Sequence, residues 1–290
     1  MIEGSQTVAR GGPEVRSSSA THQGCVRSLN EDSLLERPDL GLWVVADGMG
    51  GHQRGEYASD AIVRTLGAMP TQVAAPAFMT EVKSRLEGAN ALLRAQGLRD
   101  GGTIASTVVC LLISGWNFAC VWAGDSRLYL LRDGRLHRVS TDHSVVQDLV
   151  DAGALTPEQA ATHPRGNEVT RAVGAFDRLT PEVRQGTVQS NDVFLLCSDG
   201  LTRMIADDEI AALACDGEGE PAPLVDALIA ETLRRGASDN VTVIVVRCLR
   251  PTLAAEEIDT LVLSKRPTAL AADQAAAPTL CEPGPDDAAH

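Results

Sequence analysis

The apolar positions along the chain fall into short continuous runs and into helical stripes. Continuous apolar runs of this length are typical of buried strands, and they occupy residues 42–46, 107–113, 118–123, 128–132, 193–197 and 241–246. Apolar residues at three- and four-residue spacing predict helices, and this pattern covers residues 55–66, 77–94, 144–152 and 221–235. The sequence TPEQ at 156–159 predicts a further helix start, because it combines a capping box with proline at the first helical position.

The order of these segments favours an α+β sandwich of mainly antiparallel sheets. The run at 128–132 leads through Asp133 and Gly134 into residues 135–139, and Asp-Gly is a strong hairpin signal. The runs at 118–123 and 128–132 form a close pair separated only by GDSR. The helices come in blocks beside the strands instead of alternating with them, which argues against a doubly wound parallel sheet.

The expected organisation is one domain over residues 16–250. Residues 1–15 are expected to form a flexible lead-in and residues 251–290 a disordered tail, because the tail is rich in Ala, Pro, Asp and Thr without an apolar period. No stretch approaches about 18 apolar residues, and the first residues contain no apolar signal region, so neither a membrane span nor secretion is expected. No dimerisation element is obvious, which favours a monomer.

Charge and cysteine usage narrow the class of protein. A net charge of −14 and a pI near 4.8 argue against nucleic acid or an anionic membrane as the main partner, because phosphate groups are bound by stripes of lysine and arginine. The seven cysteines are odd in number and irregularly spaced, which argues against a disulfide framework. Cysteines inside apolar runs are expected in the core, and these are Cys110, Cys120, Cys197 and Cys248. This usage fits a reducing cytoplasm.

Acidic residues recur at the ends of the predicted strands. Asp47 directly follows the run at 42–46 and precedes three glycines in four residues. An unpaired carboxylate at the end of a buried strand costs several kcal/mol or takes up a proton. Asp125, Asp199 and Asp239 have similar positions beside apolar runs. One such aspartate is more often a turn former that bonds its own backbone, so their recurrence is the informative feature.

Converging carboxylates would repel one another unless a multivalent cation compensated their charge. Ligation by carboxylate, carbonyl and water oxygens suits Mg2+ or Mn2+. A zinc site would need closely spaced His or Cys, and the sequence has neither Cys-x-x-Cys nor His-Glu-x-x-His. Asp47 is therefore expected to bind a metal ion, with the glycines letting the carbonyl of Gly48 approach the same ion.

Eight ordered sequence blocks resemble the metal-dependent type-2C serine/threonine protein phosphatases of the PPM family, in particular the compact bacterial branch. The blocks are GCVRSLNEDS (24–33), VVADGMGGH (44–52), AST (105–107), VWAGDSRLYLLRDG (121–134), TDHS (141–144), HPRGNEVTRAVG (163–174), LLCSDGL (195–201) and ASDNVTVIVV (237–246). The resemblance implies a four-layer α-β-β-α sandwich of two mainly antiparallel sheets flanked by helices, with a small flap subdomain. It also implies a site for two Mn2+ or Mg2+ ions.

The same resemblance implies which residues hold the two ions. Asp47 would bridge both ions and thereby take part in catalysis. Glu31 and the carbonyl of Gly48 would bind one ion, and Asp199 and Asp239 would bind the other.

Further residues have implied roles at this site. Asp32 would act in catalysis by orienting metal-bound water, and Asp125 would join Asp199 in holding a third, weaker ion. Arg27 would act in catalysis by binding the substrate phosphate through its planar fork. His52 is a candidate for the acid that protonates the leaving oxygen, with water as the alternative, although a lone histidine is more often structural.

The segment 143–174 resembles the flap of the bacterial members, which borders the active site and affects substrate selection. Its first short helix is expected to end at Gly153 and to have an apolar face made of Val145, Val146, Leu149 and Val150. We expect a specificity element here, and the alternative is a plain helical hairpin on the surface.

The expected activity is hydrolysis of phosphoserine and phosphothreonine in proteins by a metal-activated water, which would reverse serine/threonine kinase signalling. The partners would be phosphoproteins, including a cognate kinase and its targets. Attack by water is expected instead of a phosphoenzyme, because no nucleophile constellation is obvious. Two alternatives remain open: a phosphoprotein-binding adaptor with weak catalysis, and a metal phosphoesterase acting on small molecules. The adaptor is disfavoured because every expected acidic position is filled, and the metabolite enzyme is disfavoured by the flap.

Overall fold

The computed structural model describes residues 6–8, 11–50, 54–71, 75–216 and 220–251. Its strands are β1 (Gln6–Val8), β2 (Glu14–His22), β3 (Asp32–Arg37), β4 (Leu42–Met49), β5 (Ala105–Ser106), β6 (Val108–Ser114), β7 (Asn117–Ala123), β8 (Arg127–Arg132), β9 (Arg135–Arg138), β10 (Glu182–Thr187), β11 (Val193–Cys197) and β12 (Val241–Leu249). Its helices are α1 (Arg54–Gly67), α2 (Ala75–Asp100), α3 (Val145–Asp151), α4 (Pro157–Ala161), α5 (Asp199–Thr202), α6 (Asp207–Asp216) and α7 (Pro221–Arg234).

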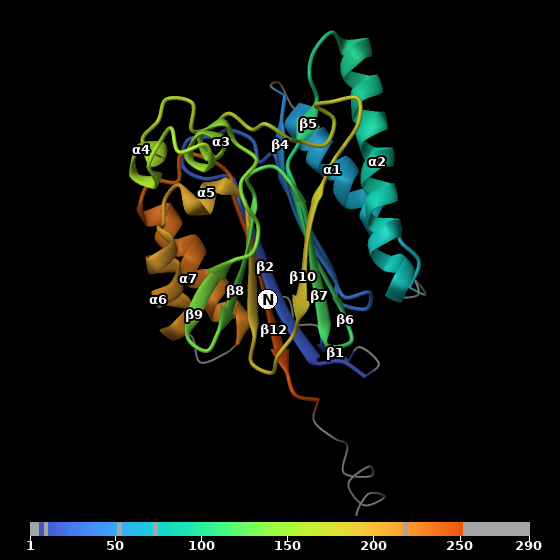
Figure 1. The fold of residues 1–290 in the computed structure, drawn as a ribbon, viewed down its shortest axis with the longest axis vertical. Coiled ribbons are helices and arrows are strands. Elements are labelled where there is room, and N and C mark those ends of the chain that lie inside the picture. The colour runs from blue at the N-terminus through green and yellow to red at the C-terminus, as the bar shows by residue number, and fades with distance from the viewer. Residues whose placement is uncertain (1–5, 9–10, 51–53, 72–74, 217–219, 252–290) are drawn as a thin grey trace, which may run out of the picture. The chain divides into compact units, whose positions relative to one another are not determined.

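Two antiparallel sheets lie between two pairs of helices. One sheet has the strand order β1-β2-β12-β11-β8-β9, and the other has the order β10-β7-β6-β4-β3, with β5 paired to β4. Figure 1 shows α1 and α2 over the sheet that contains β4, and α6 and α7 over the sheet that contains β12. The predicted four-layer α-β-β-α sandwich is therefore confirmed.

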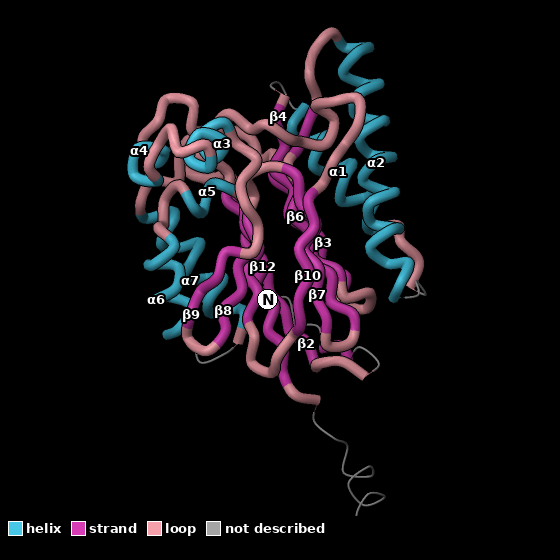
Figure 2. The backbone as a smooth tube through the Cα atoms, viewed as in Figure 1, coloured by secondary structure: helices cyan, strands magenta, loops and turns pink. Residues whose placement is uncertain are grey.

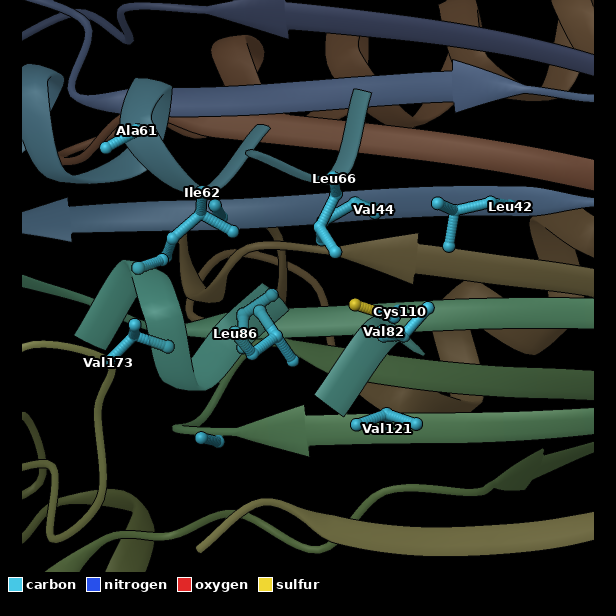
Figure 3. Close-up of a cluster of buried hydrophobic side chains, with 14 of the residues drawn as sticks. Leu42, Val44, Ala61, Ile62, Leu66, Val82, Leu86, Cys110, Val121 and Val173 are labelled. Carbon is cyan, nitrogen blue, oxygen red and sulfur yellow. The ribbon is translucent and has the colours of Figure 1, made fainter. Parts of the chain in front are cut away.

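The run 42–46 is continuously apolar because both faces of β4 are buried. Leu42, Val44 and Ala46 belong to the core under the helices, and Figure 3 shows Leu42 and Val44 among side chains of α1 and α2. Trp43 and Val45 belong to the core between the two sheets. Successive residues of a strand point to opposite faces, so a strand in this layer needs apolar residues throughout.

A third apolar core lies between α6, α7 and the sheet formed by β11 and β12. The cysteines that the apolar runs placed in the core are free and buried, and these are Cys110, Cys120, Cys197 and Cys248. Their expected role as small core residues is confirmed.

One connection differs from the expected strand pairing. Only residues 124–126 separate β7 from β8, but β7 pairs with β6 and β10, whereas β8 pairs with β9 and β11. The GDSR link therefore crosses between the two sheets instead of joining neighbouring strands. The next link is the predicted hairpin, in which Asp133 and Gly134 have φ angles of 51° and 71°, as a two-residue turn between β8 and β9 requires.

The first sheet begins before residue 16. β2 starts at Glu14 and pairs with β1, and Val15 is only 3% exposed, so the predicted flexible lead-in is too long at this end. The apolar pattern does not predict β2, because its sequence EVRSSSATH is mostly polar. The predicted tail lies outside the described residues except for Pro251. No helix in the described part of the chain combines the length and the hydropathy of a membrane span.

The loops that carry the predicted site residues lie at one end of the sheets. β4 ends there at Met49, and α5 begins there at Asp199. Figures 1 and 2 show the short helices α3, α4 and α5 at this same end, above the strands in the view drawn.

Candidate metal centre and active site

The register of β3 and β4 places two of the predicted aspartates opposite each other. Asp32 and Asp47 are directly paired across these antiparallel strands. Thr107 holds the end of β4 in place, because its Oγ1 accepts from the Asp47 N–H at 3.2 Å and its own N–H donates to the Asp47 carbonyl at 2.8 Å. Side chains directly opposite in an antiparallel pair are neighbours, so these two carboxylates come together without any contribution from the loops.

Two glycines form a cradle around Glu31. The Gly48 N–H donates to the Glu31 carbonyl at 3.1 Å, and the Gly55 N–H donates to Glu31 Oε1 at 3.2 Å. A Cβ atom on Gly55 would lie 2.4 Å from Glu31 Oε1 and 2.7 Å from the Gly48 carbonyl oxygen. The two oxygens predicted to bind one ion therefore face the same small space, which only a glycine at position 55 leaves open.

Asp32 lies in a pocket of hydroxyl groups. It is 7% exposed, and its Oδ2 accepts from Ser198 Oγ and Thr242 Oγ1, both at 2.8 Å. Its Oδ1 is buried and has no hydrogen-bond partner among the residues that the structure describes. Burial raises the pKa of Asp32 to about 7, and the nearby charges of Asp199 and Asp239 add to this rise. One oxygen of Asp32 is thus fixed and the other is left for a ligand or a water.

Asp199 is buried at the start of α5, just after β11, and Asp125 is buried in the link between β7 and β8. Each is 8% exposed. Burial raises the pKa of Asp125 to about 7, with Asp199 contributing. Burial also raises the pKa of Asp199 to about 6, although the charge of Arg203 opposes the rise. The Oδ1 atom of Asp199, like that of Asp32, is buried without a partner.

Asp239 is held by two arginines. Its Oδ2 accepts from Arg27 Nη2 at 2.9 Å and from Arg203 Nη1 at 3.1 Å. Arg203 Nη2 also pairs with the Asp199 carboxylate. The Arg27 side chain is 50% exposed, so its guanidinium lies between the acidic residues and solvent.

Asn240 ties the loop that carries Arg27 and Glu31 to the start of β12. Its Oδ1 accepts from the Glu31 N–H at 2.8 Å, and its Nδ2 donates to the carbonyls of Gln23 and Leu29 at 2.9 and 2.8 Å. The sequence pattern predicts no role for Asn240, for Arg203 or for the hydroxyl residues around Asp32. Asn240, Ser198 and Thr242 lie inside the matched blocks, whereas Arg203 lies two residues beyond the block 195–201.

Five aspartates therefore meet at this end of the sheets. They form the acidic cluster, which consists of Asp32, Asp47, Asp125, Asp199 and Asp239. Burial raises the pKa of Asp47 well above its usual range, and the charges of the four other members raise it further. Glu31 and Gly48 lie beside the cluster through the contacts of β4 described above. His52, the candidate acid, lies outside the described residues.

The cluster fits divalent cations by its chemistry. Among the described residues, no three acidic, histidine or cysteine side chains are arranged as they stand to hold a metal ion. Arg27 and Arg203 instead occupy carboxylate oxygens of Asp199 and Asp239. Within the described residues, two buried carboxylate oxygens nevertheless have no partner, and burial, with repulsion between the carboxylates, raises the pKa of Asp32, Asp125 and Asp199. Oxygen donors of this kind are the ligands that Mg2+ and Mn2+ prefer.

A cavity of about 640 Å3 lies between the acidic cluster and the segment 143–174. Asp125, Asp199 and Arg203 line one side of it, while Val146 and Pro157 line the flap side. The capping box predicted at the start of α4 is present. No residue of α3 is fully buried, so the predicted apolar face of this helix is only partly covered. Few buried contacts are typical of segments that open locally at low cost.

The base of this segment is tied to the metal end through His143. Its ring stacks on Trp122 with centroids 5.8 Å apart, and its Nδ1 accepts from the Gly124 N–H at 3.1 Å. Gly124 directly precedes Asp125. Burial and the neighbouring Arg171 charge lower the pKa of His143, so the neutral ring that can accept this bond is favoured.

One cysteine and one arginine in the site have the Cys-x5-Arg spacing of phosphatases that form a phosphoenzyme. Cys197 ends β11 and Arg203 follows α5. Cys197 is completely buried, and burial raises the pKa of its thiol to about 12. A buried, protonated thiol is not a nucleophile, so this pair does not supply covalent catalysis.

The family model described as protein phosphatase 2C matches residues 22–249. The chain belongs to the protein phosphatase 2C family. This confirms the resemblance drawn from the eight sequence blocks. A solved structure titled "PppA, a key regulatory component of T6SS in Pseudomonas aeruginosa" is 42% identical, with a TM-score of 0.74, and the match covers 81% of this chain and 98% of that chain.

Two further family comparisons concern PstP. The serine/threonine protein phosphatase PstP of Mycobacterium tuberculosis H37Rv is 35% identical over 236 residues, which are 80% of this chain and 44% of PstP. The chain therefore spans less than half the length of that curated relative. The catalytic domain of PstP has been solved in complex with two manganese ions, and it is 32% identical with a TM-score of 0.74, over 81% of this chain and 98% of that chain.

Proposed function

We propose that this protein hydrolyses phosphoserine and phosphothreonine in other proteins, with two Mn2+ or Mg2+ ions as cofactors and a third, weaker ion. The observation that carries the proposal is the acidic cluster, in which two of the five aspartates pair with arginines and two buried carboxylate oxygens have no partner among the described residues. One relative supports it, since PstP is named a serine/threonine protein phosphatase and its catalytic domain was solved with two manganese ions.

The proposed ligands are the residues that the family resemblance implies. Asp47 would bind both ions, with Glu31 and the Gly48 carbonyl on one side and Asp199 and Asp239 on the other. Asp125 would hold the weaker ion together with Asp199. Bound ions of this kind lower the pKa of water and offset negative charge on the phosphoryl oxygens during in-line displacement.

Two residues would act on the substrate and on the attacking water. Arg27 can donate two parallel hydrogen bonds to phosphoryl oxygens through its half-exposed guanidinium, and this would fix the phosphate in line. The free Oδ1 of Asp32 can accept a hydrogen bond from the attacking water, because Ser198 and Thr242 hold the other oxygen. Water or His52 would protonate the leaving oxygen.

The substrate side of the site favours a protein. The cavity beneath the segment 143–174 adjoins the acidic cluster, and its flap wall is thinly packed. Such a wall can adapt to a peptide chain, so we propose that it selects among phosphoproteins, including a cognate serine/threonine kinase and its targets. A monomer located in the cytoplasm, as expected from the sequence, completes the proposal.

A direct assay tests this function. The purified full chain should release phosphate from p-nitrophenyl phosphate and from a phosphothreonine peptide when Mn2+ is added, and EDTA should abolish both activities. Release from the small ester but from no phosphopeptide would instead identify a small-molecule phosphoesterase. Binding of the phosphopeptide without any metal-dependent release would identify an adaptor.

A further inference from the structure

The short helix α5 directs one arginine back onto the acidic cluster. Asp199 is its first residue, and Arg203 caps its C-terminal end. Residues four apart in a helix lie on the same side, so the Arg203 guanidinium reaches the carboxylate one turn before it. Its Nη2 pairs with Asp199 Oδ2, and its Nη1 donates to Asp239 Oδ2 at 3.1 Å.

Arg203 thus bridges two carboxylates that are proposed to bind the same ion. Asp199 starts α5, whereas Asp239 lies two residues before β12. At Asp239 both carboxylate oxygens already accept hydrogen bonds, Oδ1 from the Asn240 N–H at 2.9 Å and Oδ2 from the guanidinium. A divalent ion placed between the two carboxylates would therefore compete with a donor at Asp239, and it would also be repelled by the positive charge of Arg203. The ion and the arginine therefore cannot both hold these oxygens at full strength.

We propose that Arg203 is an internal counter-ion that bridges Asp199 and Asp239 in the metal-free protein and is displaced when a divalent ion binds. The inference rests on the proposed metal site. Arg203 would then weaken ion binding, and it would also stabilise the metal-free fold against repulsion among the buried carboxylates. Because Arg203 lines the cavity under the flap, its side chain has space to move when it is displaced.

The chain contains a matched control in α1. Arg64 follows Asp60 at the same four-residue spacing, and its Nε lies 2.8 Å from Asp60 Oδ2. The Arg64 side chain is 80% exposed, and this ion pair includes no member of the acidic cluster. Replacing either arginine with glutamine removes the same charge, but only Arg203→Gln removes it from the site.

The experiment compares Mn2+ binding and unfolding in the full chain. Wild type, R203Q, R203K and R64Q are stripped of metal and titrated with Mn2+ by calorimetry. We expect R203Q to bind Mn2+ about tenfold more tightly than R64Q. Ion binding to R203Q no longer has to break the charge-assisted hydrogen bonds of Arg203, and the free energy of such bonds corresponds to a change in affinity of about this size. R203K should lie between R203Q and wild type, because lysine keeps the charge but lacks the fork.

Thermal unfolding gives a second measurement that does not depend on catalysis. In EDTA, R203Q should unfold about 3 °C or more below R64Q, because the buried carboxylates lose a partner. Saturating Mn2+ should remove most of this difference, since tight binding adds stability to the folded state.

Three results would overturn the inference. One is an R203Q affinity equal to or weaker than that of R64Q, and another is an equal unfolding temperature of the two variants in EDTA. If R203Q does not fold, R203K decides the question, and a wild-type Mn2+ affinity in that variant overturns the inference. A wild-type protein that binds no Mn2+ at all would overturn the proposed metal site as well, so the two failures are distinguishable.

Discussion

The acidic cluster differs sharply from the seam between α6 and α7, which consists of Glu209, Glu231, Arg234 and Arg235. At the seam, Arg235 donates to Glu209 at 2.7 and 2.8 Å and to Glu231 at 2.8 Å, and Arg234 donates to Glu231 at 2.6 and 2.7 Å. These hydrogen bonds lower the pKa of both glutamates to about 2. Each carboxylate of the seam therefore has a cation of its own.

In the acidic cluster the pKa shifts run in the opposite direction. Burial raises the pKa of Asp32 and of Asp125 to about 7, and of Asp199 to about 6. In the described part of the chain, only Arg27 and Arg203 pair with members of the cluster. The carboxylates of the seam are paired with arginines, whereas burial and mutual repulsion in the cluster disfavour ionised carboxylates that a bound cation would stabilise. Changes at the cluster should therefore alter activity, while changes at the seam should alter only stability.

The largest expected effect comes from removing one carboxylate of the cluster. Asp199→Asn and Asp239→Asn should each lower kcat/KM for p-nitrophenyl phosphate roughly 1,000-fold, because an ion contributes several kcal/mol of charge stabilisation and each 1.36 kcal/mol is tenfold. Both variants should also bind Mn2+ more weakly by calorimetry. Circular dichroism spectra should remain those of the wild type.

The seam provides the control for this pair of variants. Glu209→Gln makes the same chemical change on an exposed glutamate that pairs with Arg235, and it should keep the wild-type rate and Mn2+ affinity. An Asp199→Asn protein with normal Mn2+ binding and normal activity would contradict the proposed ligand role.

The next effect concerns Arg27, the half-exposed arginine that pairs with Asp239 of the cluster. Arg27→Ala should lower kcat/KM about 100-fold, the scale for losing one group that stabilises charge in the transition state. Arg27→Lys should recover only part of the rate, because lysine cannot donate two parallel bonds. Mn2+ affinity should not fall, since Arg27 itself occupies an oxygen of Asp239. Parallel losses of activity and Mn2+ affinity in Arg27→Ala would show that Arg27 supports the metal site instead of binding phosphate.

A third effect separates the two regions by pH. In EDTA, the carboxyl groups of the cluster with raised pKa values hold protons in the folded state that the unfolded chain releases near pH 4. Their contribution to stability is therefore present at low pH and is lost as the pH rises from about 4 to 7. The free energy of unfolding should fall by about 2 kcal/mol over this range, less than the sum for independent groups because they are coupled.

Urea unfolding at several pH values checks this effect, with and without Mn2+. Saturating Mn2+ should abolish the fall, because the ions compensate the ionised carboxylates. Asp125→Asn should make the fall shallower in EDTA, since one of the raised groups is gone. A metal-free protein whose stability rises between pH 4 and 7 would show that the cluster is not electrostatically strained.

The sequence predicts the strands of this fold best where both faces are buried. β4 and β11 are continuous apolar runs because apolar cores lie on both sides of them. β2 is mostly polar and escapes the pattern, although Val15 at its start is buried. The sequence of the GDSR link does not reveal which kind of connection it makes, because nothing in four residues distinguishes a hairpin from a crossing between sheets. That distinction depends on which strands lie alongside, which is a long-range property.

The residues of the site show the same difference between what local sequence predicts and what depends on long-range contacts. The acidic positions can be recognised because each follows or precedes an apolar strand and lies in a matched block. Asn240 could not be recognised, because its role is set by contacts across the fold: it bonds the carbonyl of Gln23, 217 residues earlier in the chain. The same holds for the contact of Arg203 with Asp239, although its pair with Asp199 spans only four residues. Local spacing carries no information about such partners, so they emerge only when the sheets bring the two ends of the domain together.

The smallest expected effect lies at the seam. Arg234 pairs with Glu231 in a three-residue helical spacing, and its side chain is 69% exposed. Arg234→Gln should therefore lower the unfolding temperature only slightly at low ionic strength and not at all near 0.5 M NaCl, because salt screens exposed pairs. Its rate and Mn2+ affinity should equal those of the wild type. The lowered pKa of Glu231 stabilises the fold above about pH 4, and this stabilisation is lost as the pH falls toward 2. The difference in unfolding temperature between Arg234→Gln and wild type should therefore disappear in acid. The cluster shows the opposite trend in EDTA, because its destabilising effect grows as the pH rises. A variant at the seam that changed activity as much as Arg27→Ala would erase the distinction between the two regions.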